Sequence, residues 1–134
     1  MVSPTFPDNL ILLWFETGQE TPITLVRLMH DVGTGNLGIN LDVANLILYD
    51  TGNPVDALDV FGAHVRGVHA KDGTPPTEPD QLGTETPLGQ GDVGIERFLQ
   101  TLIDIGYQGP LTIEREITGE QQKADIIAAR QLLE

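Results

Sequence analysis

Apolar and polar residues alternate along the chain in blocks that predict strands and helices in turn. A continuous apolar run from Leu10 to Phe15 is typical of a strand that is covered on both faces. The next block places apolar residues at helical spacing, has Thr21 and Pro22 as cap and first-turn residues, and stops at Gly33. These two blocks together predict one βα unit.

The same alternation recurs along the rest of the chain. Further strands are predicted at 36–42, 64–70 and 110–116, and further helices at 53–62, 94–106 and 119–134. Alternation of this kind predicts parallel strands that are joined by crossover helices. We therefore expect an α/β fold in which residues 1–134 form a single domain of four parallel βα units.

A long segment rich in Pro, Gly and Thr, residues 73–92, separates the third predicted strand from the next helix. A loop of this length is either a mobile linker or a functional lid. It follows closely on the polar residues His69 and Lys71, which favours the lid. Within it, Gly89 and Gly91 form a weak phosphate-loop signal, which a tight turn into the following helix explains equally well.

The charge balance and the absence of cysteine narrow the classes of function. Twenty acidic residues against seven Lys and Arg give a net charge of −13, which repels nucleic-acid backbones and anionic membrane surfaces. Without cysteine there is no disulfide, zinc–thiolate site or thiol catalysis, so a cytoplasmic location is the expectation. Glu16 ends the first apolar run too early for a signal peptide or a membrane span.

Each of the four predicted strands carries a potential metal ligand or acid–base group near its carboxyl end. These residues are Glu16, Asp42, His69 and Glu114. Equivalent strand ends of a parallel βα array converge on one rim, where α/β folds place their sites. Three carboxylates and one imidazole suit Mn²⁺ or Mg²⁺ better than a thiol-loving metal, and zinc is less favoured.

Each of these residues also has an ordinary structural explanation when it is taken alone. Asp42 could cap a helix that begins directly after it. His69 could be a half-buried histidine with satisfied hydrogen bonds, and Glu114 could pair with Arg115 or Lys71. The four residues at repeating positions make a shared metal site harder to dismiss than any one of them does alone, but the residues by themselves leave both explanations open.

Five segments in order resemble the carboxyl-terminal half of the xylose isomerase-like TIM-barrel superfamily of sugar phosphate isomerases and epimerases. They are FETG, INLDVANLILY, VRGVHAKDG, PLGQGDVGIERFLQTL and GYQGPLTIERE, and the resemblance runs from about Leu10 to the end of the chain. It implies a (β/α)4 half of a TIM barrel. It also implies one divalent ion, Mn²⁺, Mg²⁺ or Co²⁺, whose ligands are Glu16, Asp42, His69 and Glu114.

The resemblance further implies proton transfer on a small carbohydrate or sugar phosphate. Such an isomerisation needs a Lewis acid on the carbonyl and hydroxyl oxygens, so that an enediolate can form. By resemblance, Glu16 and Glu114 act as catalytic bases from opposite faces of the substrate. Lys71 is expected to bind substrate oxygens or a phosphate, although a salt bridge to Asp72 explains it equally well. Asn45 stands where many relatives have a substrate-contacting histidine.

Four βα units are half of the eight that a TIM barrel needs. An open half-barrel exposes two strand edges and, we expect, one apolar face, which a partner must cover. We therefore predict self-association as a homodimer, or association with a complementary half-barrel; a truncated chain with masked edges is the third possibility. The alternative function is a non-catalytic module that binds a metal or polyol, or merely keeps the fold.

Overall fold

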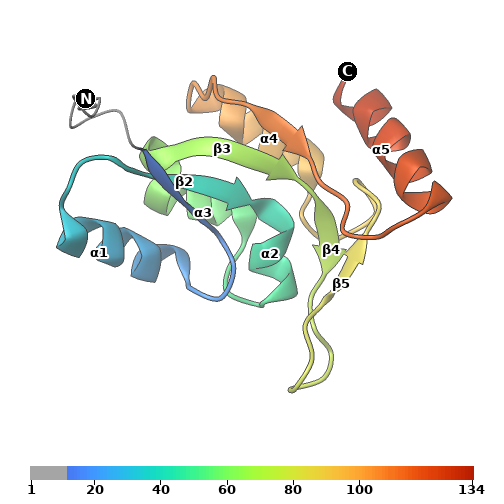
Figure 1. Ribbon diagram of the computed structural model, residues 1–134, viewed down its shortest axis with the longest axis horizontal. Helices are drawn as coiled ribbons and strands as arrows, with labels where there is room; N and C mark the ends of the chain where they lie inside the picture. The colour runs from blue at the N-terminus through green and yellow to red at the C-terminus, as the bar shows by residue number, and fades with distance from the viewer. Residues whose placement is uncertain (1–11) are drawn as a thin grey trace, which may run out of the picture.

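Four parallel strands form one sheet in the order β1-β2-β3-β6 in the computed structural model, which describes residues 12–134 (Figure 1). The α/β fold with parallel βα units is therefore confirmed, and the sheet is that of a partial TIM barrel. The strands are β1 (Leu13–Glu16), β2 (Leu37–Asp42), β3 (Val65–Ala70) and β6 (Leu111–Ile113).

Helices connect or follow the strands. They are α1 (Pro22–Val32), α2 (Val43–Leu48), α3 (Pro54–Phe61), α4 (Ile95–Asp104) and α5 (Glu120–Leu133), with a 3-10 turn η1 (Gly62–His64) before β3. Helices α1, α3, α4 and α5 lie where the sequence predicts helices, whereas α2 is an additional short helix directly after β2. The predicted boundaries of the first helix are confirmed, because Thr21 caps it and Gly33 ends it in a left-handed conformation. In the part of the chain that the structure describes, no helix has the length and apolar character needed to cross a membrane.

The core lies between the outer face of the sheet and the helices. Ile39, Leu41 and Val68 point outward from β2 and β3 and are fully buried, as are Phe61 of α3 and Phe98 of α4. Helix α3 packs against both α1 and α4, so these helices form a continuous layer. This layer explains why every second residue of β2, and of β3 from Val68 onward, is apolar.

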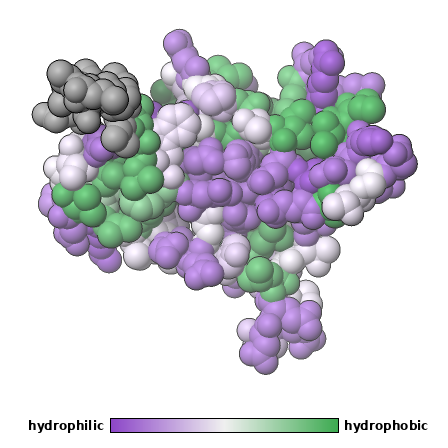
Figure 2. All heavy atoms as spheres, in the orientation of Figure 1, coloured by the Kyte–Doolittle hydropathy of each residue, from purple (hydrophilic) through white to green (hydrophobic). Residues whose placement is uncertain are grey.

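The inner face of the sheet is not apolar, contrary to our expectation. Gly38 and Gly67 lie on this face beneath the ring of Trp14, and Asn40 lies beside them. Towards the carboxyl ends of the strands, the same face carries the polar candidate residues. Figure 2 shows a hydrophilic band across the middle of the molecule. The exposed large apolar residues of the sheet are in its edge strands: Leu13 and Trp14 of β1 and Leu111 of β6, of which Trp14 lies on the inner face.

Two local differences from the predicted pattern affect the site. The segment predicted as a loop contains an antiparallel pair, β4 (Asp72–Thr74) and β5 (Thr84–Thr86), which extends beyond the sheet (Figure 1). Strand β6 is shorter than predicted, so Glu114 lies just after it. Part of the strand predicted at 10–15 lies outside the described residues.

Candidate metal centre

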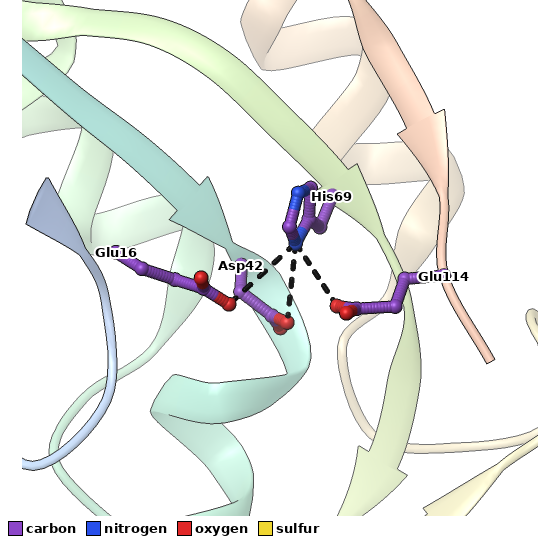
Figure 3. A group of neighbouring side chains, drawn as sticks. All are labelled: Glu16, Asp42, His69 and Glu114. Atoms are coloured by element: carbon purple, nitrogen blue, oxygen red, sulfur yellow. Dashed lines mark ion pairs between the residues drawn. The ribbon is translucent and has the colours of Figure 1, made fainter. Parts of the chain in front are cut away.

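The carboxyl ends of the four parallel strands bring the four candidate ligands together (Figure 3). One ligand atom from each residue lies within 4.8 Å of the corresponding atoms of the other three. The Nδ1 atom of His69 is 3.6 Å from Glu16 Oε1, 3.7 Å from Asp42 Oδ2 and 2.9 Å from Glu114 Oε2. The four residues that the sequence singles out thus meet at one point.

Strand register explains this convergence. Asp42 lies opposite His69 in the β2–β3 pair, so both side chains leave the sheet side by side on the same face. Glu16 ends β1 on one side of this pair. On the other side, the backbone N–H of Glu114 donates to the carbonyl of Ala70, which fixes the chain after β6. Figure 3 shows the two glutamates approaching from opposite sides of Asp42 and His69.

The ligand atoms face a common point. His69 Nδ1 and Glu114 Oε2 are buried and lie 2.9 Å apart as an ion pair, but neither atom makes a well-directed hydrogen bond. Buried polar atoms without such a bond are rare in protein interiors. Three carboxylates and an imidazole nitrogen are a donor set for a divalent cation, so the residues present fit one.

Asp42 has both of the roles that the sequence left open. Its Oδ1 accepts a hydrogen bond from the backbone N–H of Asn45 at 2.9 Å, which caps α2. Its Oδ2 faces His69 and Lys71. The hydroxyl of Thr17 donates to the Asp42 carbonyl at 2.7 Å, which fixes the backbone as well. The cap therefore holds the carboxylate in the orientation that the site needs.

Lys71 is buried among carboxylates, with only 2% of its surface exposed. Its Nζ lies 2.6 Å from Glu116 Oε2, 3.3 Å from Asp42 Oδ2 and 3.6 Å from Glu114 Oε2. Burial opposes its charge, but the bond to Glu116 and the charge of Asp42 raise the pKa of Lys71 above its usual value. The expected alternative of a Lys71–Asp72 salt bridge is wrong.

Asp72 instead organises the loop that follows β3. Its carboxylate accepts hydrogen bonds from the backbone N–H groups of Gly73, Gly89 and Val93. A Cβ atom at Gly91 would overlap this carboxylate and the backbone of Gly73. The glycine-rich segment is thus packed tightly against Asp72, as the turn explanation of the sequence suggested.

The carboxyl groups of Asp42 and Glu114 differ in their protonation. Burial raises the pKa of Asp42 to about 7, against the opposing charge of Lys71, and proximity to Glu114 adds to the rise. Burial also opposes ionisation of Glu114, but Asp42, Lys71 and His69 together lower the pKa of Glu114 below its usual value. A cation at this position would favour the ionised carboxylates, so its binding would release any proton that Asp42 holds.

Asn45 and Lys71, the predicted substrate-binding residues, lie next to the candidate metal centre and contact each other. Asn45 Oδ1 accepts from Lys71 Nζ at 3.3 Å, and Asn45 Nδ2 donates to the carbonyl of Thr17 at 2.9 Å. A substrate would have to replace some of these contacts to bind either side chain. Their role in substrate binding stays a prediction.

Three polar residues around the centre were missed by the sequence reasoning. Asn40 lies within hydrogen-bond distance of His69, Glu116 pairs with Lys71, and Glu85 of β5 binds both the Arg115 guanidinium and the Glu116 backbone N–H. Asn40 and Glu116 each lie two positions from a candidate ligand, so the period of two along an extended chain was an available signal. Glu85 is distant in sequence and gave none. Arg115 pairs with Glu85 and Asp125 rather than with Glu114.

The model of the family described as "Xylose isomerase-like TIM barrel" matches residues 12–134. The chain belongs to this family. The crystal structure of a xylose isomerase domain protein from Planctomyces limnophilus shares 49% sequence identity and superposes with a TM-score of 0.86 over 91% of this chain and 45% of that one. A D-tagatose 3-epimerase-like protein shares 26% identity, with a TM-score of 0.67 over 92% of this chain and 45% of that one.

Among curated relatives in the family, L-ribulose-5-phosphate 3-epimerase UlaE of Shigella boydii is 34% identical over 90 residues, which are 66% of this chain and 30% of that protein. An uncharacterized protein of Methanocaldococcus jannaschii is 30% identical over 99 residues, 72% of this chain and 31% of that protein. The chain thus spans about a third of the length of these two curated relatives and 45% of the length of the two solved structures.

Proposed function

We propose that this chain is the metal-binding half-barrel of a sugar or sugar phosphate isomerase or epimerase. The observation that carries the proposal is the convergence of four ligand atoms, two of which are buried without a well-directed hydrogen bond. The epimerase relatives support the reaction class. Glu16, Asp42, His69 and Glu114 would hold one divalent ion, with Mn²⁺, Mg²⁺ or Co²⁺ favoured over zinc.

When bound, the ion would supply Lewis-acid chemistry to the carbonyl and hydroxyl oxygens of the sugar. Glu16 and Glu114 would move the carbon-bound proton. One carboxylate takes the proton from carbon to leave an enediolate, and the other carboxyl group returns a proton to the opposite face, which inverts the carbon. Their approach from opposite sides of Asp42 and His69 supports this division of labour (Figure 3).

Accessibility differs between the two glutamates. Half of the Glu16 side chain is exposed, whereas the Glu114 side chain is 29% exposed and lies beside Lys71. Lys71 holds Glu114 and Asp42 in place by its charge, because its ammonium group lies within 3.6 Å of both carboxylates.

We propose that residues 73–92 act as a lid, because the β4–β5 pair begins directly after Lys71 and extends beyond the sheet.

The experiment combines metal binding with proton exchange. Saturating Mn²⁺ should raise the melting temperature of the wild type, since a cation at about 100 times its Kd stabilises the folded state by about 2.7 kcal/mol. His69→Ala should remove this shift, whereas the matched control His64→Ala, on η1 outside the site, should keep it. With Mn²⁺ present, a ketose panel in D₂O should show exchange of substrate C–H protons, and Glu114→Gln should abolish it.

The possible results separate the two candidate functions. A wild type without a thermal shift in Mn²⁺, Mg²⁺, Co²⁺ or Zn²⁺ would refute the metal site. A metal shift without proton exchange on any sugar would favour the non-catalytic module. Exchange that persists in Glu114→Gln would refute the acid–base assignment.

We also propose that the sheet is completed by further strands. Within residues 12–134, β1 pairs only with β2 and β6 only with β3, so each has an open edge. Leu12 and Leu13 are more than half exposed beside the open edge of β1. A second copy of the chain or a complementary half-barrel could pair with both edges. Native mass spectrometry should show a dimer with bound metal, and a monomeric mass at micromolar concentration would refute self-association.

A further inference from the structure

Both ring nitrogens of His69 have defined neighbours. Nδ1 faces the three carboxylates of the metal centre, and Nε2 lies 3.0 Å from the side-chain nitrogen of Asn40. We infer that Asn40 is a positioning residue, which holds the ring with Nδ1 towards the cation and accepts the Nε2 proton when a cation is bound. This inference rests on the proposed metal function and names a residue outside the predicted ligand set.

The neighbouring strand leaves space for the Asn40 side chain to reach His69. Asn40 lies opposite Gly67 in the β2–β3 pair, one alternation before Asp42 and His69. A Cβ atom at Gly67 would lie 2.6 Å from Asn40 Oδ1 and 3.4 Å from the ring of Trp14. The missing side chain at Gly67 therefore provides the space in which the Asn40 amide reaches His69.

The chemistry of a neutral imidazole explains why an amide suits this position. Such a ring has one N–H donor and one lone pair. A cation on Nδ1 takes the lone pair there, so the proton must be on Nε2 and needs an acceptor. A half-turn of the amide places Oδ1 where Nδ2 is, with almost no change of shape. Asparagine can therefore donate to Nε2 or accept from it, whereas aspartate can only accept and leucine can do neither.

Binding of Mn²⁺ by position-40 variants tests the inference. Asn40→Leu keeps the approximate volume and should weaken binding about 10- to 100-fold, the usual effect of losing the hydrogen-bond partner of a ligating histidine. Asn40→Asp should bind Mn²⁺ at least as tightly as the wild type, because its carboxylate accepts the Nε2 proton. Calorimetric titration measures both affinities.

Two glycine variants provide a matched pair on the same face. Gly67→Ala should displace the Asn40 amide and weaken Mn²⁺ binding as Asn40→Leu does. Gly38→Ala is the control, because its Cβ would press on Arg66 Cγ at 2.7 Å and Trp14 Cδ1 at 2.9 Å instead of on Asn40. It should strain the same face while the Mn²⁺ affinity stays within about threefold of the wild type, well short of the loss expected for a missing partner.

Nitrogen-15 NMR of His69 gives a readout that general destabilisation does not move. In the Mg²⁺-loaded wild type, Nε2 should carry the proton, and Asn40→Leu should shift its resonance and speed its exchange. The inference is overturned if Asn40→Leu binds Mn²⁺ like the wild type, or if Gly67→Ala binds no more weakly than Gly38→Ala. A wild type that binds no metal refutes the proposed function. The contact between Asn40 and His69 is then tested in the metal-free protein: an Nε2 resonance that Asn40→Leu leaves unchanged overturns the inference.

Discussion

Replacement of Lys71 by methionine should be among the most destabilising single changes near the candidate metal centre. Lys71 and Asp42 are both buried, and their charged atoms are 3.3 Å apart. Methionine keeps the length of the side chain but leaves Asp42 buried without its counter-ion. Breaking a buried ion pair by removing one partner costs about 3–5 kcal/mol.

The structure places the expected loss for Lys71→Met at the lower end of this range, about 3 kcal/mol. The pKa of Asp42 is already about 7, so this carboxyl group can take up a proton when its counter-ion is lost. Glu114 and Glu116 are partly exposed and can be hydrated instead. For a domain of this size, about 3 kcal/mol corresponds to a melting temperature that is roughly 10 °C lower.

The assay is urea unfolding in the presence of a chelator, with two further variants. Lys123→Met is the matched control, because Lys123 pairs with Glu120 at 2.7 Å on the exposed surface of α5, where such a pair contributes about 0.5 kcal/mol. The double variant Lys71→Met/Asp42→Asn removes both buried charges and should recover much of the loss. The reasoning is refuted if Lys71→Met costs no more than Lys123→Met, or if the double variant is less stable than Lys71→Met alone.

Three further changes have defined outcomes. The folded protein holds the Asp42 proton more tightly than the unfolded chain, with a pKa of about 7 against 3.8. The tighter binding of this proton therefore stabilises the folded state in full below pH 3.8, and this stabilisation is lost as the pH rises to 7. Urea unfolding of the chelated protein should show this loss, at most about 4 kcal/mol, and Asp42→Asn should remove it. Gly91→Ala should cost about 3 kcal/mol, the upper end of the usual cost of overpacking, because the new Cβ overlaps Asp72 and Gly73. Gly94→Ala meets no atom within 4 Å and should cost only the strain of its positive φ, about 1–2 kcal/mol. Equal losses in thermal melts would contradict this steric argument. Arg115→Met should separate β5 from α5, because it leaves Glu85 and Asp125 without their shared counter-ion; hydrogen exchange should then accelerate in both elements, and unchanged protection would refute the link.

The hydrophobic pattern predicted the order of the parallel βα units, and the strand ends indicated the four residues that meet at the candidate metal centre. It could do so because strand alternation and strand ends are local properties of the chain, and parallel topology then brings equivalent ends to one rim. The pattern was less successful at the boundaries. It overestimated the length of β6. It also predicted residues 73–92 as a loop, although this segment contains β5 and most of β4.

The surroundings of the ligands depended on tertiary structure. The sequence left open whether Asp42 caps a helix or belongs to the site, and the fold shows that its two oxygens do both. The contact of Glu85 with Arg115 and Glu116 joins segments about 30 positions apart, and no local pattern encodes it. The polar, glycine-rich inner face also came as a correction.

The sequence by itself determined which residues reach the rim, because the period of a strand fixes the face of every side chain once its end is known. Tertiary structure alone decided what each of these residues contacts there. The bulge between β2 and β3 sets Asn40 against Gly67 and Asp42 against His69. Burial, which depends on the whole packed domain, then raises the pKa of Asp42. The same packing places Lys71 among carboxylates from other segments.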